Sequence, residues 1–217
     1  MQIFAPRANT IARLALASVV GVPLLAIAFL CAIMYTPYIT RQNIVVPQVV
    51  PFSHAHHVGE LGIDCRYCHT GVEQSRYAGL PPTETCMTCH SQLWTNAPML
   101  APVRQSLATG VPLQWKRVNR LPDYAYFDHS VHITNGVGCE TCHGVVDRMP
   151  LMRQAAPLTM GWCLSCHRDP APHLRPEHAI FDTEWTRPPD QAKRGQELMK
   201  HYGIHNQHLT DCSVCHR

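Results

Sequence analysis

Apolar residues are concentrated near the start of the chain, where residues 14–40 contain no charged side chain. A helix over residues 14–35 alone would be about 33 Å long, enough to cross a hydrocarbon layer about 30 Å thick. A cleaved signal peptide is the alternative, but its apolar region would be shorter, and no clear A-x-A cleavage site follows. We therefore predict an uncleaved membrane anchor within residues 1–37.

The residues around this apolar stretch predict its orientation. Arg7 and Arg13 precede it, and the positive-inside rule then places the N-terminus in the cytoplasm. Tyr35 and Tyr38 suit the outer interface. The rest of the chain is expected on the periplasmic side of the cytoplasmic membrane. Cys31 is expected to be a membrane-buried thiol, with lipidation as the alternative.

Beyond the anchor, the pattern of polar and apolar residues predicts few regular elements. Aromatic residues make up 7% of the sequence, and about 180 residues remain, which is little chain for a large core. A helix is expected over residues 190–202, with Asp190 as its N-cap, and residues 113–118 are a candidate strand. The Pro-rich residues 170–189 are expected to wrap the surface, and residues 98–122 to form an irregular linker.

The most specific pattern is C-x-x-C-H, the attachment signature of c-type haem. Two thiols one turn apart add to the two vinyl groups of one haem, and the next residue binds the iron as proximal ligand. Zinc sites and disulfides are the alternatives, but zinc sites do not require a histidine beside the second cysteine every time. We predict five covalently bound haem c groups. The five motifs use ten of the eleven cysteines: Cys65/Cys68/His69, Cys86/Cys89/His90, Cys139/Cys142/His143, Cys163/Cys166/His167 and Cys212/Cys215/His216.

This cofactor content determines the predicted fold class. Five haems would themselves supply most of the buried apolar surface of so short a chain. Stability would then be coupled to haem attachment, and we expect the apo-chain to be largely unfolded. The predicted fold is a small, loop-rich, mainly α multihaem cytochrome c domain with little strand, tethered by one N-terminal transmembrane helix.

A second pattern, F-x-H-x-x-H, precedes two of the five motifs. It occurs at residues 52–57 and 127–132, and each copy is followed by one C-x-x-C-H and then by another, 21 or 24 residues later. We interpret this as a tandem duplication of a dihaem unit. The predicted organisation is an anchor (1–37), an extended tether (38–51), dihaem module 1 (52–97), a linker (98–122), dihaem module 2 (123–172), and a C-terminal wrap, helix and fifth haem (173–217).

The iron of an electron carrier also takes a sixth ligand, and ten histidines remain after the five proximal ones. His54, His57, His129 and His132 are the main candidates, because isolated surface histidines would not repeat this placement. His56 stays undecided, since it abuts His57 and would point the other way on an extended chain.

Weaker candidates for distal ligands lie further along the chain. His205 and His208 are spaced like a distal pair before Cys212, but they can equally be exposed surface residues. Met149, and less so Met160, can either bind an iron or pack in the core. The choice matters because His/Met ligation raises the potential of a haem relative to bis-His ligation.

The net charge becomes informative once the haem propionates are counted. The formal charge of +3 includes Arg7 and Arg13 of the anchor, which leaves +1 for the rest. The propionates and ferric irons would bring this to about −4 oxidised and about −9 reduced if every propionate were ionised. Nucleic acid is therefore not an expected partner.

Several segments together resemble a known family, the pentahaem cytochrome c subunits (ActA) of alternative complex III. The likeness covers essentially residues 47–217, and the apolar N-terminal helix fits as well. More broadly, the F-x-H-x-x-H unit with its C-x-x-C-H resembles the cytochrome c3/c7 class. The segments that carry the resemblance are PFSHAHHVGELGIDCRYCH, LPPTETCMTCHSQLWTNAPML, YFDHSVHITNGVGCETCHGVVDRMPLM, MGWCLSCHRDP and LTDCSVCHR.

The resemblance implies ligands, partners and a role. In the c3/c7 class the first histidine of the pattern serves the haem that follows, which would be His54 and His129 here, and the second serves another haem. Alternative complex III is a membrane quinol oxidoreductase with an iron–sulfur subunit, polysulfide-reductase-like membrane subunits and a monohaem cytochrome c. This chain would relay electrons to a periplasmic acceptor or a terminal oxidase, with no catalytic residue of its own. The histidine-rich tail, residues 173–208, departs from the family and leaves the sixth ligand of the last haem open.

Two other function classes compete with an electron relay. A multihaem reductase needs a five-coordinate iron with acid–base groups beside it, and the sequence has neither a C-x-x-C-K variant nor a suitable charged cluster. A stand-alone quinol dehydrogenase of the NapC/NrfH type also has one anchor helix and four or five haems. Residues 38–51, however, contain no acidic residue to take protons from quinol.

Overall fold

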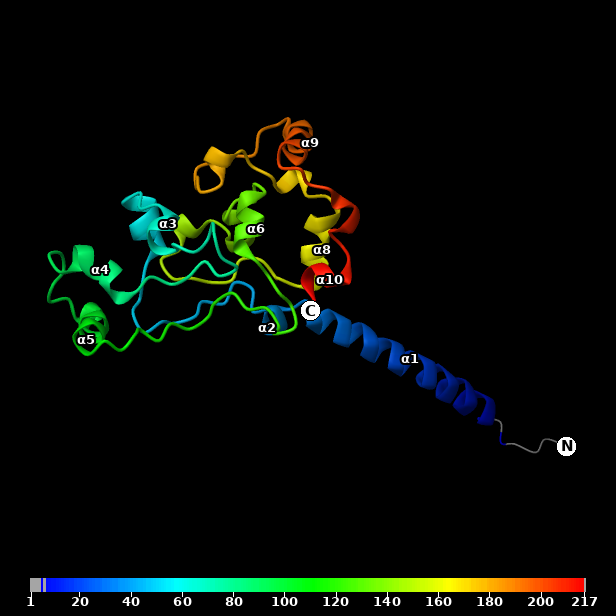
Figure 1. Cartoon of the computed structure of the whole chain (residues 1–217). Helices are drawn as coiled ribbons and strands as arrows, with labels where there is room; N and C mark the ends of the chain where they lie inside the picture. Colours follow the sequence, from blue (N-terminus) through cyan, green and yellow to red (C-terminus); the bar gives the residue numbers. More distant parts are fainter. Residues whose placement is uncertain (1–4, 6, 217) are drawn as a thin grey trace. The chain divides into compact units, whose positions relative to one another are not determined.

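The computed structural model describes residue 5 and residues 7–216; residues 1–4 and 6 of the predicted anchor region and residue 217 lie outside the described residues. The chain forms two compact units, Met1–Arg41 and Gln42–Arg217. Over the described range, β-type pairing is limited to four isolated bridges. The predicted loop-rich, mainly helical fold with little strand is confirmed (Figure 1). The helices are α1 Ala8–Met34, α2 Pro37–Thr40, η1 Ala55–Glu60, α3 Cys65–Cys68, α4 Thr83–His90, η2 Pro98–Leu100, α5 Ala101–Thr109, α6 His129–Thr134, α7 Glu140–His143, η3 Val146–Arg148, α8 Met160–Arg168, η4 Ala171–His173, η5 Glu177–Ala179, α9 Gln191–His201, η6 Asn206–His208 and α10 Cys212–Cys215.

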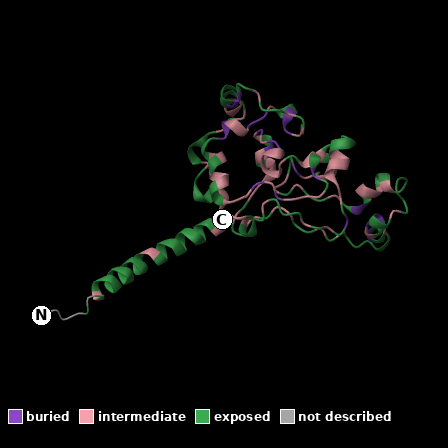
Figure 2. Cartoon of the chain, turned by 180° about the vertical axis from the view of Figure 1, so that it is seen from behind, coloured by how far each residue is buried: buried purple, intermediate pink, exposed green. Residues whose placement is uncertain are grey.

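The first unit consists of α1 and the single turn α2. Helix α1 has 27 residues, a mean hydropathy of 2.6 over its most apolar window and no buried residue (Figure 2). It is long and apolar enough to cross a membrane, so the prediction of one apolar N-terminal helix is confirmed. Pro23 lies inside the helix, as membrane helices tolerate. The predicted extended tether starts later than expected, because Pro37 begins α2.

The second unit begins with an extended segment that packs against distant parts of the chain. Gln42 bridges to Gln154, and Val45 bridges to Arg153. Val50 is buried in a cluster with Leu100 and Val103. Cys86 and Met87 of a C-x-x-C-H motif pack on the same cluster. The segment therefore supports one of the motifs instead of serving only as a spacer.

The region between the two predicted modules differs from its prediction. Residues 98–122 are not irregular throughout, because η2 and α5 occupy Pro98–Leu100 and Ala101–Thr109. A proline in the first turn starts α5, and Gly110 ends it with a left-handed φ of 69°. The candidate strand over residues 113–118 is wrong: this stretch is extended without a bridging partner. Its apolar residues pack individually, as Leu113 and Trp115 do on the cluster around Val103.

The segment that precedes α9 is predicted to wrap the surface, and this is wrong for its first half. Leu174 is 1% exposed and Ala179 is fully buried. The predicted helix over residues 190–202 is confirmed as α9, but the side chain of Asp190 pairs with Arg194 and makes no capping hydrogen bond. Gln191 at the start of α9 donates to the carbonyl oxygen of Leu174 over 2.8 Å. Pro-rich chain can be buried when such side chains satisfy its carbonyl groups.

Candidate haem-binding sites

Each of the five C-x-x-C-H motifs lies on a short helix of its own. These helices place the two cysteines of a motif one turn apart, and all eleven cysteines of the chain are free thiols. That spacing suits attachment to the two edges of one porphyrin. We number the sites by sequence: site 1 (Cys65/Cys68/His69, α3), site 2 (Cys86/Cys89/His90, α4), site 3 (Cys139/Cys142/His143, α7), site 4 (Cys163/Cys166/His167, α8) and site 5 (Cys212/Cys215/His216, α10).

Cys89 of site 2 differs from most of the predicted attachment cysteines, because it is exposed. Cys212 of site 5 is exposed as well. The physical reason at site 2 is that α4 packs on the cluster around Val50 through Cys86, which is half-buried. The Sγ atom of Cys89 lies 3.9 Å from the hydroxyl oxygen of Thr88, which is a long contact. A porphyrin would have to supply the cover of this thiol itself, and the role of Cys89 in attachment stays a prediction.

The proximal histidines are held by their Nδ1 atoms. In four of them a backbone carbonyl oxygen lies at hydrogen-bond distance from Nδ1. An N–H donated from Nδ1 fixes the tautomer and leaves Nε2 free to bind a metal. The distances are 2.7 Å for His69 to Gly79, 3.2 Å for His90 to Leu93, 2.8 Å for His167 to Leu209 and 3.0 Å for His216 to Tyr124.

His143 of site 3 is held by a side-chain amide instead. Its Nδ1 lies 3.1 Å from the amide group of Asn119, whose Oδ1 atom is buried without a partner. Rotating this amide by 180° would let Oδ1 accept the Nδ1 proton, which satisfies both groups. Burial lowers the pKa of His143 to about 4, and the ring is therefore neutral, as metal binding requires.

The two F-x-H-x-x-H segments have the same internal geometry. The ring of Phe52 lies 4.8 Å from that of His54 and 4.3 Å from that of His57. The equivalent distances from Phe127 are 4.8 Å to His129 and 4.3 Å to His132. One phenylalanine in each segment thus orients two histidines on successive turns, which explains why the pattern contains it.

The second histidine of each segment has its own Nδ1 anchor. The Nδ1 atom of His57 lies 2.8 Å from the carbonyl oxygen of Ser53, and that of His132 lies 2.7 Å from the carbonyl oxygen of Asp128. Nδ1 of His129 lies 2.8 Å from the carbonyl oxygen of Arg76. These three distal candidates therefore present Nε2, like the proximal histidines.

Three distal candidates face a proximal histidine at the separation that a shared metal requires. A bond from a metal to an imidazole nitrogen is about 2 Å long, so two imidazoles on opposite sides of one metal have centroids about 6 Å apart. The rings of His57 and His90, of His129 and His143, and of His132 and His167 have centroids 6.2, 6.3 and 6.1 Å apart. Together with the paired thiols, these donors fit a c-type haem with two histidine ligands at sites 2, 3 and 4.

His54 is the fourth distal candidate, and it lies in the electrostatic field of His69. Burial, and then the nearby His69, lower the pKa of His54 to about 4. Its Nδ1 atom is buried without a hydrogen-bond partner. The ring is thus neutral and close to the proximal histidine of site 1, which is consistent with the pairing that the sequence resemblance implies.

The remaining ligand candidates lie in other surroundings. His56 is bound through Nδ1 to Glu60 over 2.7 Å and stacks on the ring of Trp94. His205 is exposed, and so is His208, whose Nδ1 lies 3.0 Å from a carboxylate oxygen of Asp211. Their roles stay predictions.

The two methionine candidates differ strongly in burial. Met149 is 1% exposed, and its terminal methyl group lies against Gly144. Met160 at the start of α8 is 65% exposed. The burial of Met149 is that of a core residue, and the facing of His143 by His129 supplies site 3 with a histidine pair.

The ring beside the proximal histidine of site 5 belongs to a tyrosine, not to a second histidine. Among the described residues, the aromatic ring beside that of His216 is Tyr124, at 5.8 Å. The amide N–H of Tyr126 donates to the carbonyl oxygen of Cys215, and Ala125 bridges to His216. The first residues of module 2, just before Phe127, thus form the wall of site 5. Sequence reasoning missed this wall, as it missed Asn119, because neither lies near its motif in the sequence.

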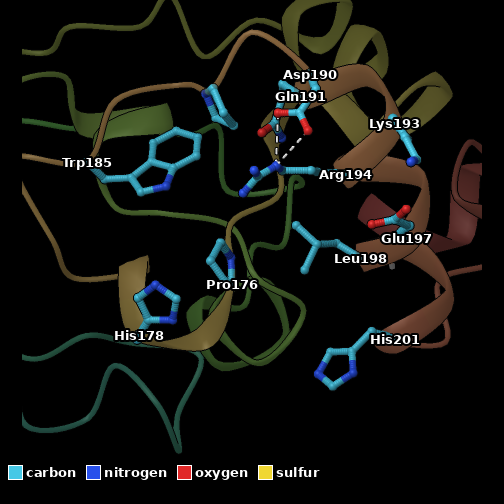
Figure 3. Close-up of a pocket in the computed structure, with 11 residues that line it drawn as sticks. Pro176, His178, Trp185, Asp190, Gln191, Lys193, Arg194, Glu197, Leu198 and His201 are labelled. Atoms are coloured by element: carbon cyan, nitrogen blue, oxygen red, sulfur yellow. Dashed lines mark hydrogen bonds and ion pairs between the residues drawn. The ribbon is translucent and has the colours of Figure 1, made fainter.

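The lining of an open pocket of about 510 Å³ contains no residue of the five motifs (Figure 3). It is formed by α9 and the segment before it, with His178, Trp185 and His201 among its lining residues. No cysteine and no proximal histidine line it. Two spare histidines of the tail, His178 and His201, therefore lie at this pocket rather than at a motif.

Comparison with known proteins gives one informative relative. No family model matches the chain. The chain is 29% identical over 176 residues to the multiheme cytochrome c subunit of a menaquinone reductase from Nitratidesulfovibrio vulgaris. The alignment covers 78% of this chain and 77% of that protein.

Proposed function

We propose that this chain is an electron-transfer subunit that carries five c-type haems within a membrane quinone or quinol oxidoreductase. The observation that carries the proposal is the facing of histidine rings at metal-sharing distance beside the paired thiols of sites 2, 3 and 4. The relative supports it, since that protein is named as a multiheme subunit of a menaquinone reductase.

The chain's own contribution is to hold and separate the haems. Bound haem supplies one-electron redox chemistry, while the protein sets ligand type, hydrogen bonding and burial. Histidine ligands on both faces leave no position for a substrate at sites 2, 3 and 4. Carbonyl oxygens at Nδ1 raise the basicity of the imidazoles and stabilise the ferric state. The chain is therefore a redox subunit and not an enzyme by itself.

The finer assignment is the pentahaem subunit of alternative complex III. It rests on the motif contexts of the sequence and predicts an iron–sulfur subunit, polysulfide-reductase-like membrane subunits and a monohaem cytochrome c as partners. Helix α1 would anchor the chain in the cytoplasmic membrane, with Arg7 on the cytoplasmic side and the haems on the periplasmic side. Electrons would flow from quinol and the iron–sulfur clusters to a periplasmic acceptor or a terminal oxidase.

The name of the relative makes the opposite direction of flow the second candidate. A menaquinone reductase delivers electrons to quinone, and the haems of one subunit can carry electrons in either direction. Rapid-mixing experiments on the intact complex separate the two: reduction of its haems by added quinol supports the first direction, and oxidation of pre-reduced haems by quinone supports the second. Neither reaction would occur if the chain did not serve a quinone-linked complex.

Haem content and ligation give the direct test on this chain. We expect five haems per chain by pyridine haemochrome, and low-temperature EPR of the oxidised protein should show low-spin signals from sites 2, 3 and 4. A methionine-type near-infrared magnetic circular dichroism band assigned to these sites would contradict the histidine pairs. A stand-alone quinol dehydrogenase would oxidise quinol as the purified single chain, and a reductase would turn over nitrite or hydroxylamine.

A further inference from the structure

The arrangement of the five sites in space differs from their order along the chain. We propose that they form one row in the order 2–1–3–4–5, so that sites 2 and 5 are its two ends and site 1 is interior. This inference rests on the proposed function, since it gives the path along which the relay would run. Each of the four neighbouring pairs is supported by contacts between its own residues.

Sites 1 and 2 are joined through both of their ligand segments. The hydroxyl groups of Tyr67, inside the first motif, and Thr88, inside the second, are hydrogen-bonded over 2.9 Å. His54 and His57 lie one turn apart around the start of η1, and the second of them faces His90 of site 2. A single turn of helix therefore links the two sites.

Sites 1 and 3 meet where the two modules contact each other. The thiols of Cys65 and Cys139 lie near each other, and each shifts the pKa of the other, downward for Cys65 and upward for Cys139. Cys139 also packs on a core cluster that contains Val72, just after the first motif, and Ile133 of α6. One attachment cysteine from each site thus lies at a common boundary.

The contact between the modules is reciprocal. The amide N–H of Ala55, next to His54, donates to the carbonyl oxygen of Met149 over 3.0 Å. The amide N–H of Ser130, next to His129, donates to the carbonyl oxygen of Ser75 over 3.2 Å. Each acceptor lies six residues after the proximal histidine of the other module. The two modules are therefore related by an approximate two-fold axis that passes between sites 1 and 3, which places sites 2 and 4 outside them.

Sites 3 and 4 repeat the arrangement of sites 1 and 2. His129 and His132 lie on one turn of α6 and face His143 and His167 respectively. The row thus continues outward from the two-fold axis in module 2 as it does in module 1.

Site 5 extends the row beyond site 4 only. Nδ1 of His167 lies 2.8 Å from the carbonyl oxygen of Leu209, three residues before Cys212. The thiol of Cys215 is close enough to Cys163 to raise its pKa, second to burial. In the described residues, module 1 has no fifth site beyond site 2. The first four sites of the row are therefore arranged symmetrically, and site 5 lengthens the row beyond site 4.

The test is to locate the irons in the intact holo-complex by cryo-electron microscopy. We expect the shortest iron–iron distances to be those of 2–1, 1–3, 3–4 and 4–5, with sites 2 and 3 separated by site 1. A map in which site 2 is the nearest neighbour of site 3, or in which site 5 adjoins module 1, would overturn the order. This map is independent of the proposed function: irons in the predicted order in a complex that exchanges no electrons with quinone would reject the function and keep the order.

A matched pair of variants gives a second test in solution. His54→Met and His57→Met each place a methionine at one iron, interior site 1 or terminal site 2, and each should raise the potential of that haem. In the proposed row, site 1 adjoins site 3. In His54→Met, the oxidation state of the altered site 1 haem should therefore shift the midpoint potential of the site 3 haem. In His57→Met, the oxidation state of the altered site 2 haem should leave the midpoint potential of site 3 unchanged. The reverse result would contradict the order, and the methionine band in the near infrared confirms that each variant carries the new ligand.

Discussion

The two predicted dihaem modules differ by one residue between their second histidine and their first cysteine, and helix geometry takes up this difference. Seven residues separate His57 from Cys65, whereas six separate His132 from Cys139. In module 1 the segment is the π-helix η1, and in module 2 it is the α-helix α6. The closing hydrogen bond spans six residues, from Ile63 to His57, in the first and five, from Val137 to His132, in the second. A wider turn thus absorbs the extra residue while the phenylalanine–histidine distances stay the same.

A second difference concerns the residue after the first cysteine of each module. In module 1 this is Arg66, which pairs with Asp64 at the surface, both about half exposed. In module 2 it is Glu140, which pairs with Arg175 where the two side chains are 15% and 7% exposed. Arg175 also lies over the ring of Trp185. The ligand geometry is therefore shared, but the contacts with the tail differ: module 2 is held by the buried ion pair of Glu140 with Arg175, whereas Arg66 of module 1 lies over the ring of Phe181 and keeps its ion pair at the surface.

The largest expected effect comes from removing the first histidine of each module. His54→Ala and His129→Ala should each convert one low-spin iron to a high-spin, ligand-accessible one, because each removes a distal ligand. EPR and carbon monoxide binding measure this. The two variants should behave alike if the modules are equivalent, and His178→Ala is the control that should leave the spectrum unchanged, since His178 lines the pocket away from the motifs. A normal spectrum for His129→Ala would reject the assignment of the 6.3 Å ring pair.

The next largest effect separates the two modules. Arg175→Ala should destabilise the holo-protein by about 3–5 kcal/mol, because it leaves Glu140 buried without its partner. Arg66→Ala, at the exposed pair, should cost about 1 kcal/mol or less. Denaturant midpoints with unchanged slopes give the comparison. Equal losses in the two variants would show that the tail does not clamp module 2.

The smallest effect concerns the contact of η1 with η3. A methyl group at Gly59 would meet the carbonyl oxygen of Asp147, so Gly59→Ala should cost about 1–3 kcal/mol through overpacking. Gly161→Ala in α8 is the matched control: nothing lies within 4 Å of the added methyl group, and the helix should gain about 0.5–1 kcal/mol. Thermal unfolding followed by circular dichroism measures both. A neutral Gly59→Ala would show that the modules do not pack through η1 as closely as described.

The sequence predicts the local parts of this molecule well. The apolar helix, α9 and the short helices at the motifs follow from hydrophobic runs and from covalent spacing, which act over a few residues. The repeated F-x-H-x-x-H pattern likewise singles out four histidines, three of which the structure holds by Nδ1. Helix α5 was missed although its start and stop signals, Pro102 and Gly110, are present in the sequence.

The sequence does not predict contacts between distant segments. Which iron His57 and His132 face depends on how one motif helix packs on the next, and no spacing encodes this. Spacing also does not distinguish the exposed thiol of Cys89 from the half-buried one of Cys86, because the cover of α4 comes from Val50 and α5.

Burial and wall contacts in the rest of the chain are equally non-local. The burial of Leu174 arises because α9 covers it and Gln191 satisfies its carbonyl group. Asn119 and Tyr124 reach sites 3 and 5 from the chain before Phe127, where neither residue type marks a ligand partner.

The nearness of the Cys65 and Cys139 thiols has a consequence for how the protein is made. They belong to two different predicted haem sites, yet they lie near each other once the modules have docked. A disulfide between them would remove one attachment point from each of the two sites. We therefore expect the maturing chain to keep both thiols reduced until each haem is attached.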